Sequence, residues 1–422
     1  YSLTQLKYIM VKKIRKNVVA AIDIGTTKVV TLIAEMPEEG NSVEIIGYGV
    51  CPSRGLKRGI VVNIETTTHA ISESVEAAEE MAGCQIKDVY TGVSGSHIRS
   101  FNSHGIVAIR QQEINQPDID RVLDAAKAIA IPADQRMLHV IPQEFFIDNQ
   151  AGIKDPIGMS GVRLEAKAHI VTGAVSAVQN VVKCVQKCGF GVNDVILEQL
   201  ASSFAVLDED EKDLGVCLID IGGGTTDIAV FIDGAIRHSA VIPIAGDQVT
   251  NDIAVVLRTP TQCAEKIKMS SSCMFKTTEA KDEFIAVPSS SGNSSKEVPA
   301  NVLVEVIEAR YSELFSLVAA ELKRSVFFHL VRSGIVMTGG ASMVDGGREL
   351  AEKIFDMPVR VANPLRITGK TEVVDNPVFA TAVGLLHSGL GQEVKNNSAF
   401  YGGQEGMKGA WGRMKEWFQV NF

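Results

Sequence analysis

The sequence predicts a two-lobed α/β fold built from a duplicated domain. Two similar glycine loops carry this prediction, one starting at Asp23 (DIGTTK) and one at Asp220 (DIGGGTTD). Each loop stands between two short apolar, β-branched runs, which indicates a strand, a glycine turn and a second strand. The chain of 422 residues has room for two or more domains.

The chemistry of both loops suits a phosphate ligand. Glycine lets the backbone approach an anion closely, and consecutive N–H groups form a nest for it. Threonine hydroxyls and a lysine add donors and positive charge. The expected phosphate-binding residues are Gly25, Thr26, Thr27, Lys28, Gly222, Gly223, Gly224, Thr225 and Thr226. We expect Asp23, Asp220 and Asp227 to hold a hydrated divalent cation. Two unrelated hairpins remain the alternative.

Composition narrows the class of protein. Hydrophobic residues make up 45% of the chain and charged residues 22%, which is typical of a packed globular protein. The net charge of −9 argues against nucleic acid as the main partner. Seven cysteines without metal-ligand spacing favour thiols in a reducing compartment. We expect Met10 to be the natural start and residues 1–9 to be an upstream extension.

The first half of the chain predicts a sheet with an insertion. Apolar patterns indicate a strand at residues 43–50, a loop at 51–59, a helix at 64–82 that Gly83 ends, and a strand at 87–93. A different pattern follows. It predicts a helix beginning at Pro117 and strands near residues 105–109, 137–147 and 163–172.

The second half predicts more helices around the second glycine loop. Residues 334–341 indicate a strand that enters a glycine turn and a helix, and residues 288–296 a flexible loop or hairpin tip. The expected helices cover residues 175–187, 247–257, 260–269, 302–329 and 377–386, and another opens at Glu198.

Together these motifs resemble the actin-like ATPase superfamily. The resemblance implies two RNase H-like domains that bind ATP and Mg²⁺ between them. Segments 198–204 and 376–386 resemble the connecting helices of that family. Residues 339–343 (GGASM) resemble its adenosine motif, and 264–268 (AEKIK) its ribose-contacting helix. The cofactor-binding residues implied are Gly339, Gly340, Ala341, Met343, Glu265 and Lys268.

A narrower resemblance, from about Met10 to the C-terminus, is to the bacterial cell-division protein FtsA family. Segments 92–102 (GVSGSHIRSFN), 140–145 (VIPQEF) and 158–164 (GMSGVRL) resemble its inserted subdomain 1C; 305–314 and 381–387 also match. The resemblance implies a peripheral protein of the inner membrane at the division septum. Such a protein tethers FtsZ filaments, polymerises like actin and meets other divisome proteins. It also implies that Arg310 binds the acidic C-terminal peptide of FtsZ. An ordinary exposed arginine that pairs with Glu305 or Glu313 remains the alternative.

The resemblance divides the chain into subdomains. The implied boundaries are 17–92 and 172–208 for subdomain 1A, 93–171 for 1C, 209–246 and 321–375 for 2A, 247–320 for 2B, 376–388 for a return helix, 389–406 for a flexible linker and 407–422 for an amphipathic membrane-targeting helix.

The tail predicts a membrane-surface helix. At about 100° per residue, one arc roughly 120° wide contains Met407, Ala410, Trp411, Met414, Trp417 and Phe418. Arg413 and Lys415 flank the arc, as in interfacial helices that bind anionic lipid. Burying four large side chains in lipid is favourable by ~1.5–3 kcal/mol each. The backbone entropy lost when about a dozen residues become helical opposes this gain. One tail is therefore a weak anchor, and a polymer of tails a firm one. A helix that docks on the protein's own core remains the alternative.

Three other classes compete with a membrane-bound adaptor. A sugar or carboxylate kinase would share the phosphate loops, a chaperone would need a further peptide-binding domain, and a pilus-assembly homologue would share the inserted subdomain. Hydrolysis stays open. Glu198 or Gln199 could orient an attacking water, or the two could be a surface polar pair before a packed helix.

Overall fold

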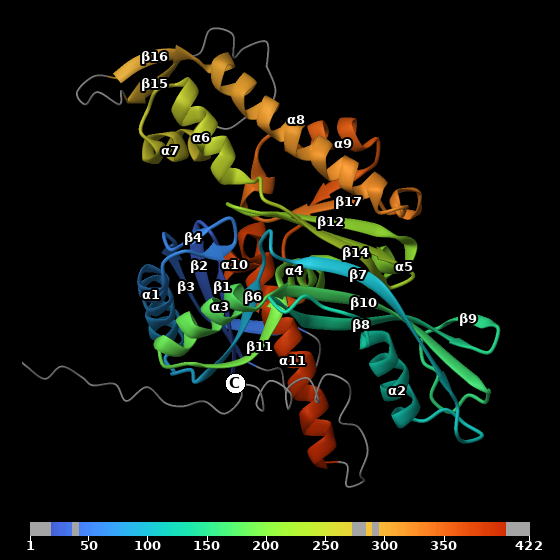
Figure 1. Ribbon diagram of the computed structural model, residues 1–422. Coiled ribbons are helices and arrows are strands. Elements are labelled where there is room, and N and C mark those ends of the chain that lie inside the picture. Colours follow the sequence, from blue (N-terminus) through green and yellow to red (C-terminus); the bar gives the residue numbers. More distant parts are fainter. Residues whose placement is uncertain (1–17, 36–41, 272–283, 289–294, 402–422) are drawn as a thin grey trace, which may run out of the picture.

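The structure is a computed structural model that describes residues 18–35, 42–271, 284–288 and 295–401 (Figure 1). The first lobe is built on a six-stranded sheet with strand order β11-β6-β1-β2-β3-β19. Its strands are β1 (Val18–Ile24), β2 (Lys28–Glu35), β3 (Val43–Pro52), β6 (Asp88–Val93), β11 (Gly191–Leu197) and β19 (Ile367–Gly369).

The second lobe repeats this plan in a five-stranded sheet with order β14-β13-β12-β17-β18. Its strands are β12 (Val216–Ile221), β13 (Thr226–Ile232), β14 (Ala235–Ile242), β17 (Ile335–Thr338) and β18 (Val359–Val361). In each lobe a central strand pairs antiparallel with its hairpin partner and parallel with the strand on its other side: β1 with β2 and β6, β12 with β13 and β17. The predicted duplication and two-lobed α/β fold are confirmed.

Helices cover the sheets at the predicted places. Asn63 caps α1 (Ile64–Ala82) by accepting from Thr66 N–H, and Gly83 ends it with φ of 65°. The first lobe also contains α3 (Val175–Lys187), α4 (Glu198–Val206), α10 (Thr371–Val374), the 3₁₀ turn η4 (Pro377–Phe379) and α11 (Ala380–Tyr401). The short strand β4 (Leu56–Lys57) lies within the expected loop at 51–59, and its partner β5 (Ile60–Val61) directly follows it.

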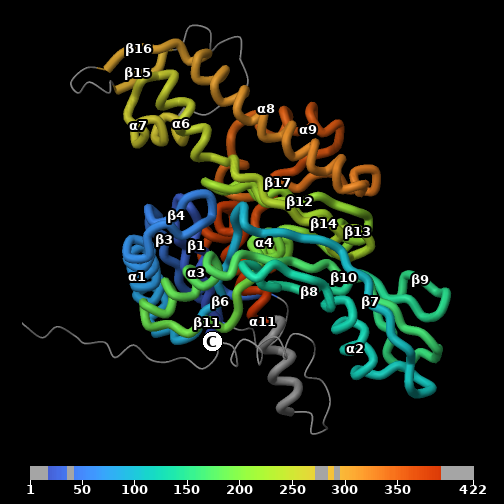
Figure 2. The backbone as a smooth tube through the Cα atoms, in the orientation of Figure 1, coloured from blue at the N-terminus to red at the C-terminus, as the bar shows by residue number. Residues whose placement is uncertain are grey.

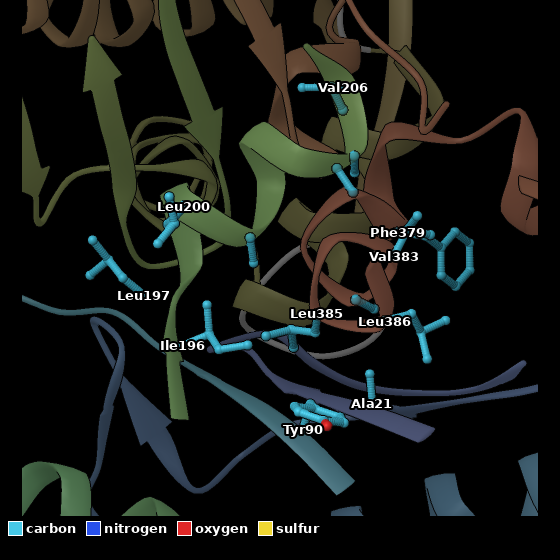
Figure 3. Close-up of a cluster of buried hydrophobic side chains, with 14 of the residues drawn as sticks. Ala21, Tyr90, Ile196, Leu197, Leu200, Val206, Phe379, Val383, Leu385 and Leu386 are labelled. Carbon is cyan, nitrogen blue, oxygen red and sulfur yellow. The ribbon is translucent and has the colours of Figure 1, made fainter. Parts of the chain in front are cut away.

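The helices α4 and α11 cross with their backbones in contact. A Cβ added to Gly384 would lie 1.8 Å from Ala201 O, so only glycine permits the crossing. Around it, apolar side chains of α4 and α11 pack with Ala21 of β1 and Tyr90 of β6 (Figure 3). This core also includes Val216 and Ala229 of the second lobe, so it joins both sheets.

The insertion forms a separate four-stranded sheet with order β7-β10-β8-β9. It comprises β7 (Arg99–Ala108), β8 (Gln135–Ile147), β9 (Gln150–Ile153) and β10 (Arg163–Ala174), with α2 (Gln116–Lys127) on one face (Figure 2). The short strand β9 is not among the sequence predictions. Pro117 is the second helical residue rather than the first, because Asn115 caps the helix.

The outer part of the second lobe forms the top of the molecule as it is drawn in Figure 1. It contains α6 (Gly246–Val256), α7 (Thr261–Ser271), the antiparallel pair β15 (Phe284–Pro288) and β16 (Ser295–Pro299), and α8 (Ala300–Arg324). The expected helix at 302–329 ends at Arg324. The remaining elements are α5 (Glu209–Leu214), α9 (Gly347–Phe355) and the 3₁₀ turns η2 (Phe328–Leu330) and η3 (Gly340–Met343).

One prediction is wrong. The linker expected from residue 389 is helical as far as Tyr401, because α11 continues through it. Gly389 suggested a flexible start, but a Cβ there would lie 2.5 Å from the ring of Tyr90, so this glycine serves close packing. Extending an existing helix costs little compared with nucleating one. Residues 402–422, including the predicted membrane helix, lie outside the described residues. Within the described residues, no helix is both long and apolar enough to cross a membrane.

Candidate functional site

The two glycine loops form matching turns that meet between the lobes. Gly25 N–H donates to Lys28 O at 2.9 Å, and Gly222 N–H donates to Thr225 O at 3.0 Å. A Cβ added to Gly223 would lie 2.3 Å from Thr27 Cγ2, and one added to Gly224 would lie 2.4 Å from Thr26 Oγ1. The predicted phosphate-binding residues of both lobes therefore come together, with glycine required at the contact.

Buried carboxyl groups gather behind the loops. Burial raises the pKa of Asp23 to about 6 and that of Asp227 to about 7, and it raises the pKa of Asp220 as well. Asp220 adds to the rise at both Asp23 and Asp227 by charge repulsion. Lys28 opposes the rise at Asp23, and burial lowers the pKa of Lys28 itself. Negative groups held this close favour a cation between them.

The predicted cation site at Asp23, Asp220 and Asp227 stays a prediction. Within the described ranges, no group of three or more His, Cys, Asp and Glu side chains is placed to ligate a metal ion. Asp220 repels both Asp23 and Asp227, and a bound cation would relieve this repulsion. A cation that keeps its water shell, as Mg²⁺ usually does, remains the expectation.

Three hydroxyl groups orient these carboxylates, and sequence reasoning missed all three. Ser94 Oγ donates to Asp227 Oδ1 at 2.5 Å. Ser202 Oγ and Thr381 Oγ1 donate to Asp220 Oδ2, at 2.5 and 3.1 Å. Ser94 follows β6, Ser202 lies in α4 and Thr381 in α11, so all three belong to the first lobe and both aspartates to the second. Small polar residues directly after a buried strand were the available signal for Ser94.

The predicted adenosine residues lie next to the second loop. Gly339 has φ of 85°, and a Cβ there would meet Asp220 Oδ1 at 2.3 Å. A Cβ on Gly246 would lie 3.3 Å from both Gly222 O and Ala341 Cβ, and 3.5 Å from Lys268 Nζ. The second glycine loop, η3 and α7 therefore all meet at the start of α6, around Gly246.

Glu265 and Lys268 face the start of α6. Lys268 Nζ lies 2.8 Å from Glu265 Oε2 and donates to Gly246 O at 3.1 Å and to Thr250 Oγ1 at 2.8 Å. Met343 in η3 is 54% exposed. Asp247 is a further acid that the sequence did not single out; burial raises its pKa to about 6, and Lys268 opposes the rise.

The two candidate catalytic residues have different surroundings. Burial raises the pKa of Glu198 well above its usual value, and repulsion by Asp23, Asp227 and Asp220 raises it further. Glu198 therefore interacts with the buried carboxyl cluster. Gln199 is fully buried, and in the part of the chain that the structure describes neither the oxygen nor the nitrogen of its side-chain amide has a hydrogen-bond partner. The alternative of a surface polar pair is therefore wrong.

Arg310 is already paired. Its Nε lies 2.5 Å from Asp252 Oδ2 of α6, its Nη2 donates to Asp252 Oδ1 at 3.1 Å, and its Nη1 lies 2.5 Å from Glu313 Oε2. The side chain is 23% exposed. The pairing with Glu313 agrees with the alternative of an ordinary surface ion pair. The role of Arg310 in partner binding stays a prediction.

Solved structures with the same fold define the class of protein. A structure of a "PilM-PilN type IV pilus biogenesis complex" has a TM-score of 0.63 at 16% identity, covering 88% of this chain and 98% of that one. MreB5 of Spiroplasma citri bound to ADP has a TM-score of 0.54 at 13% identity, covering 92% and 99%. The fold is that of the actin-like ATPases.

Sequence comparison narrows the class to one family. The profile described as "Cell division protein FtsA" matches residues 217–384, and "SHS2 domain inserted in FTSA" matches residues 95–172. Curated FtsA proteins are 55% identical in Pseudomonas aeruginosa (96% of this chain, 98% of the relative) and 42% in Escherichia coli K12 (98% and 100%). The chain belongs to the FtsA family of cell division proteins.

Proposed function

We propose that this protein binds ATP with a hydrated Mg²⁺ between its lobes. The observation that carries the proposal is the meeting of Thr26 and Thr27 with Gly223 and Gly224, in front of a buried carboxyl cluster. Backbone N–H groups, hydroxyls and Lys28 would hold the phosphates, and Asp23, Asp220 and Asp227 the hydrated cation. The Spiroplasma citri MreB5 structures bound to ADP and AMPPNP are nucleotide complexes of the same fold.

Bound ATP would act mainly by setting how the lobes sit together. Asp220 and Asp227 of the second lobe accept hydrogen bonds from Ser94, Ser202 and Thr381 of the first. A nucleotide or cation bound beside these carboxylates would therefore change the hydrogen bonds that join the lobes. Glu198 is the better candidate of the two for orienting a water, because it belongs to the carboxyl cluster. Weak hydrolysis or none is consistent with this function.

We further propose that the protein is a membrane-bound adaptor that polymerises, tethers FtsZ filaments at the septum and helps to recruit other divisome proteins. The amphipathic sequence of residues 407–422 supports the membrane contact. Family membership favours this function over a phosphotransferase or a pilus-assembly protein. The subdomain boundaries given by the family resemblance are part of the same proposal.

Sedimentation with anionic lipid vesicles tests the adaptor function. The full chain should pellet with vesicles, and it should carry FtsZ into the pellet only when both vesicles and the tail are present. ATP should increase the pelleted fraction, because a polymer presents many weak tails at once. A chain lacking residues 407–422 that still pellets with vesicles would overturn the membrane contact. Failure to carry FtsZ would overturn the tethering.

A further inference from the structure

The inserted sheet is docked on an edge strand of the second lobe. β14 is the outermost strand of its sheet, and side chains of the insert reach its carbonyl groups. Ser100 Oγ donates to Ser239 O at 2.7 Å, Asn102 Nδ2 to Arg237 O at 3.0 Å, and Gln143 Nε2 to Ile236 O at 2.7 Å. An edge strand normally leaves such groups open.

His169 of β10 lies between the inserted sheet and β14 and contacts a residue of each. His169 of β10 is 1% exposed. Its Nδ1 lies 2.7 Å from Asn102 Oδ1, and its Nε2 lies 2.9 Å from Ser239 Oγ. The contact is made by side chains, because β14 and the strands of the insert belong to separate sheets. Lys154 and Asp213 extend it with an exposed ion pair at 2.9 Å.

The same two segments also meet at the phosphate loops. Ser94 lies in the short connection between β6 and β7, and it is 1% exposed. Its partner Asp227 is on β13, where Asp227 pairs with Val241 and Ala229 pairs with Ser239 of β14. The Ser94–Asp227 bond and the Ser100–Ser239 bond therefore join one stretch of chain to one β-hairpin at two points (Figure 1).

We propose that Ser94 is a positioning residue that couples nucleotide binding to the docking of the inserted sheet on β14. This inference rests on the proposed nucleotide function. A cation held by Asp227 would fix the carboxylate in the place where Ser94 donates to it. Fixing Ser94 restrains the start of β7, and β7 carries Ser100 and Asn102. The insert should then be held more firmly on β14 when nucleotide is bound.

Hydrogen–deuterium exchange of the full chain, with and without ATP and Mg²⁺, tests the coupling. In the parent, nucleotide should slow exchange in β7 and β14 by about fivefold or more, the lower end of typical coupling between sites. Ser94→Ala should lose this slowing at saturating nucleotide, and Ser94→Thr should keep it because the hydroxyl remains. The matched control is Ser103→Ala, which removes a bond of the same strand to Ala126 O inside the insert, at 2.7 Å, and should leave the slowing in place.

Reciprocity supplies a second test that does not depend on the folding of the Ser94 variants. Asn102→Ala loosens the docking contact away from the phosphate loops. It should weaken ATP binding, by at most the factor by which ATP tightens docking. Coupling is refuted if Ser94→Ala keeps the parent's slowing, or if Asn102→Ala binds ATP like the parent. If the parent binds no ATP at all, the proposed function fails first and the coupling falls with it.

Discussion

Thr381 Oγ1 donates a 3.1 Å hydrogen bond to Asp220 Oδ2, although 161 positions separate the two residues in the chain. Thr381 is the second residue of α11 in the first lobe, and Asp220 is the last residue but one of the central strand β12 in the second. Because Ser202 donates to the same oxygen, one carboxylate ties two helices of one lobe to the sheet of the other. The bond lies in the buried core that both lobes share.

Removing this hydroxyl should loosen the lobe contact. Thr381→Val keeps the shape of the side chain and loses the donor. Hydrogen bonds to charged groups contribute about 1.5–3 kcal/mol, so the free energy of unfolding should fall by roughly that amount in urea titrations. Ser316→Ala is the control, since Ser316 bonds only within α8 at an exposed site. Equal stability of parent and Thr381→Val would show that Ser202 alone holds Asp220.

Gly223→Asp should abolish ATP binding. The new carboxylate would repel phosphate oxygens in a partly dry cleft, and its Cβ would meet Thr27 at 2.3 Å. Gly222→Ala is the matched control, because a Cβ there meets only Thr225 O, at 3.3 Å. It should bind within a few-fold of the parent by fluorescent-nucleotide titration. Unchanged affinity of Gly223→Asp would remove this loop from the site.

Asp227→Asn should stabilise the nucleotide-free fold more at pH 8 than at pH 5. The pKa of Asp227 is raised from 3.8 to about 7, so the folded state binds this proton more tightly than the unfolded chain. Its contribution to stability therefore falls as pH rises between these values. Asparagine removes that cost, by about 1–4 kcal/mol at pH 8. Urea titrations at both pH values measure the difference. A pH-independent difference would contradict the raised pKa.

Arg310→Glu should abolish co-sedimentation of FtsZ while leaving ATP binding intact, if Arg310 recognises an acidic peptide. The peptide would have to compete with Asp252 and Glu313 for the guanidinium. Arg324→Glu is a control on the same helix, where Arg324 pairs with Glu321. Full co-sedimentation of the Arg310 variant would assign this arginine to the structural pairing of α8 with α6.

Trp417→Glu should abolish binding to anionic vesicles and leave the fold and ATP binding unchanged. It places a charge inside the apolar arc, where the tryptophan ring supplies much of the buried area. Glu416→Gln, on the opposite face, is the control. Both tryptophans of the chain lie in this tail, so their fluorescence should shift to the blue when vesicles are added. A variant whose core unfolds would instead favour a tail docked on the protein.

Local patterns predicted the fold well where local forces decide it. The loop glycines, the α1 cap at Gly83 and the buried runs of β12 and β13 all follow from the sequence. Of the candidate site, the sequence could predict the parts that are contiguous motifs, namely the two glycine loops. Ser94, Ser202 and Thr381 were missed because their role comes from contacts between distant segments. The same limit explains why Gly389 suggested the start of a flexible linker. This glycine is needed because it packs against Tyr90, which is far away in sequence.

The continuity of α11 has a mechanical consequence. Its 22 residues form a stiff rod about 33 Å long that begins beside Asp220 and ends at Tyr401. The point from which residues 402–422 depart is thus set by the same helix that touches the carboxyl cluster. A small tilt of this rod beside Asp220 would therefore be magnified into a larger displacement of Tyr401.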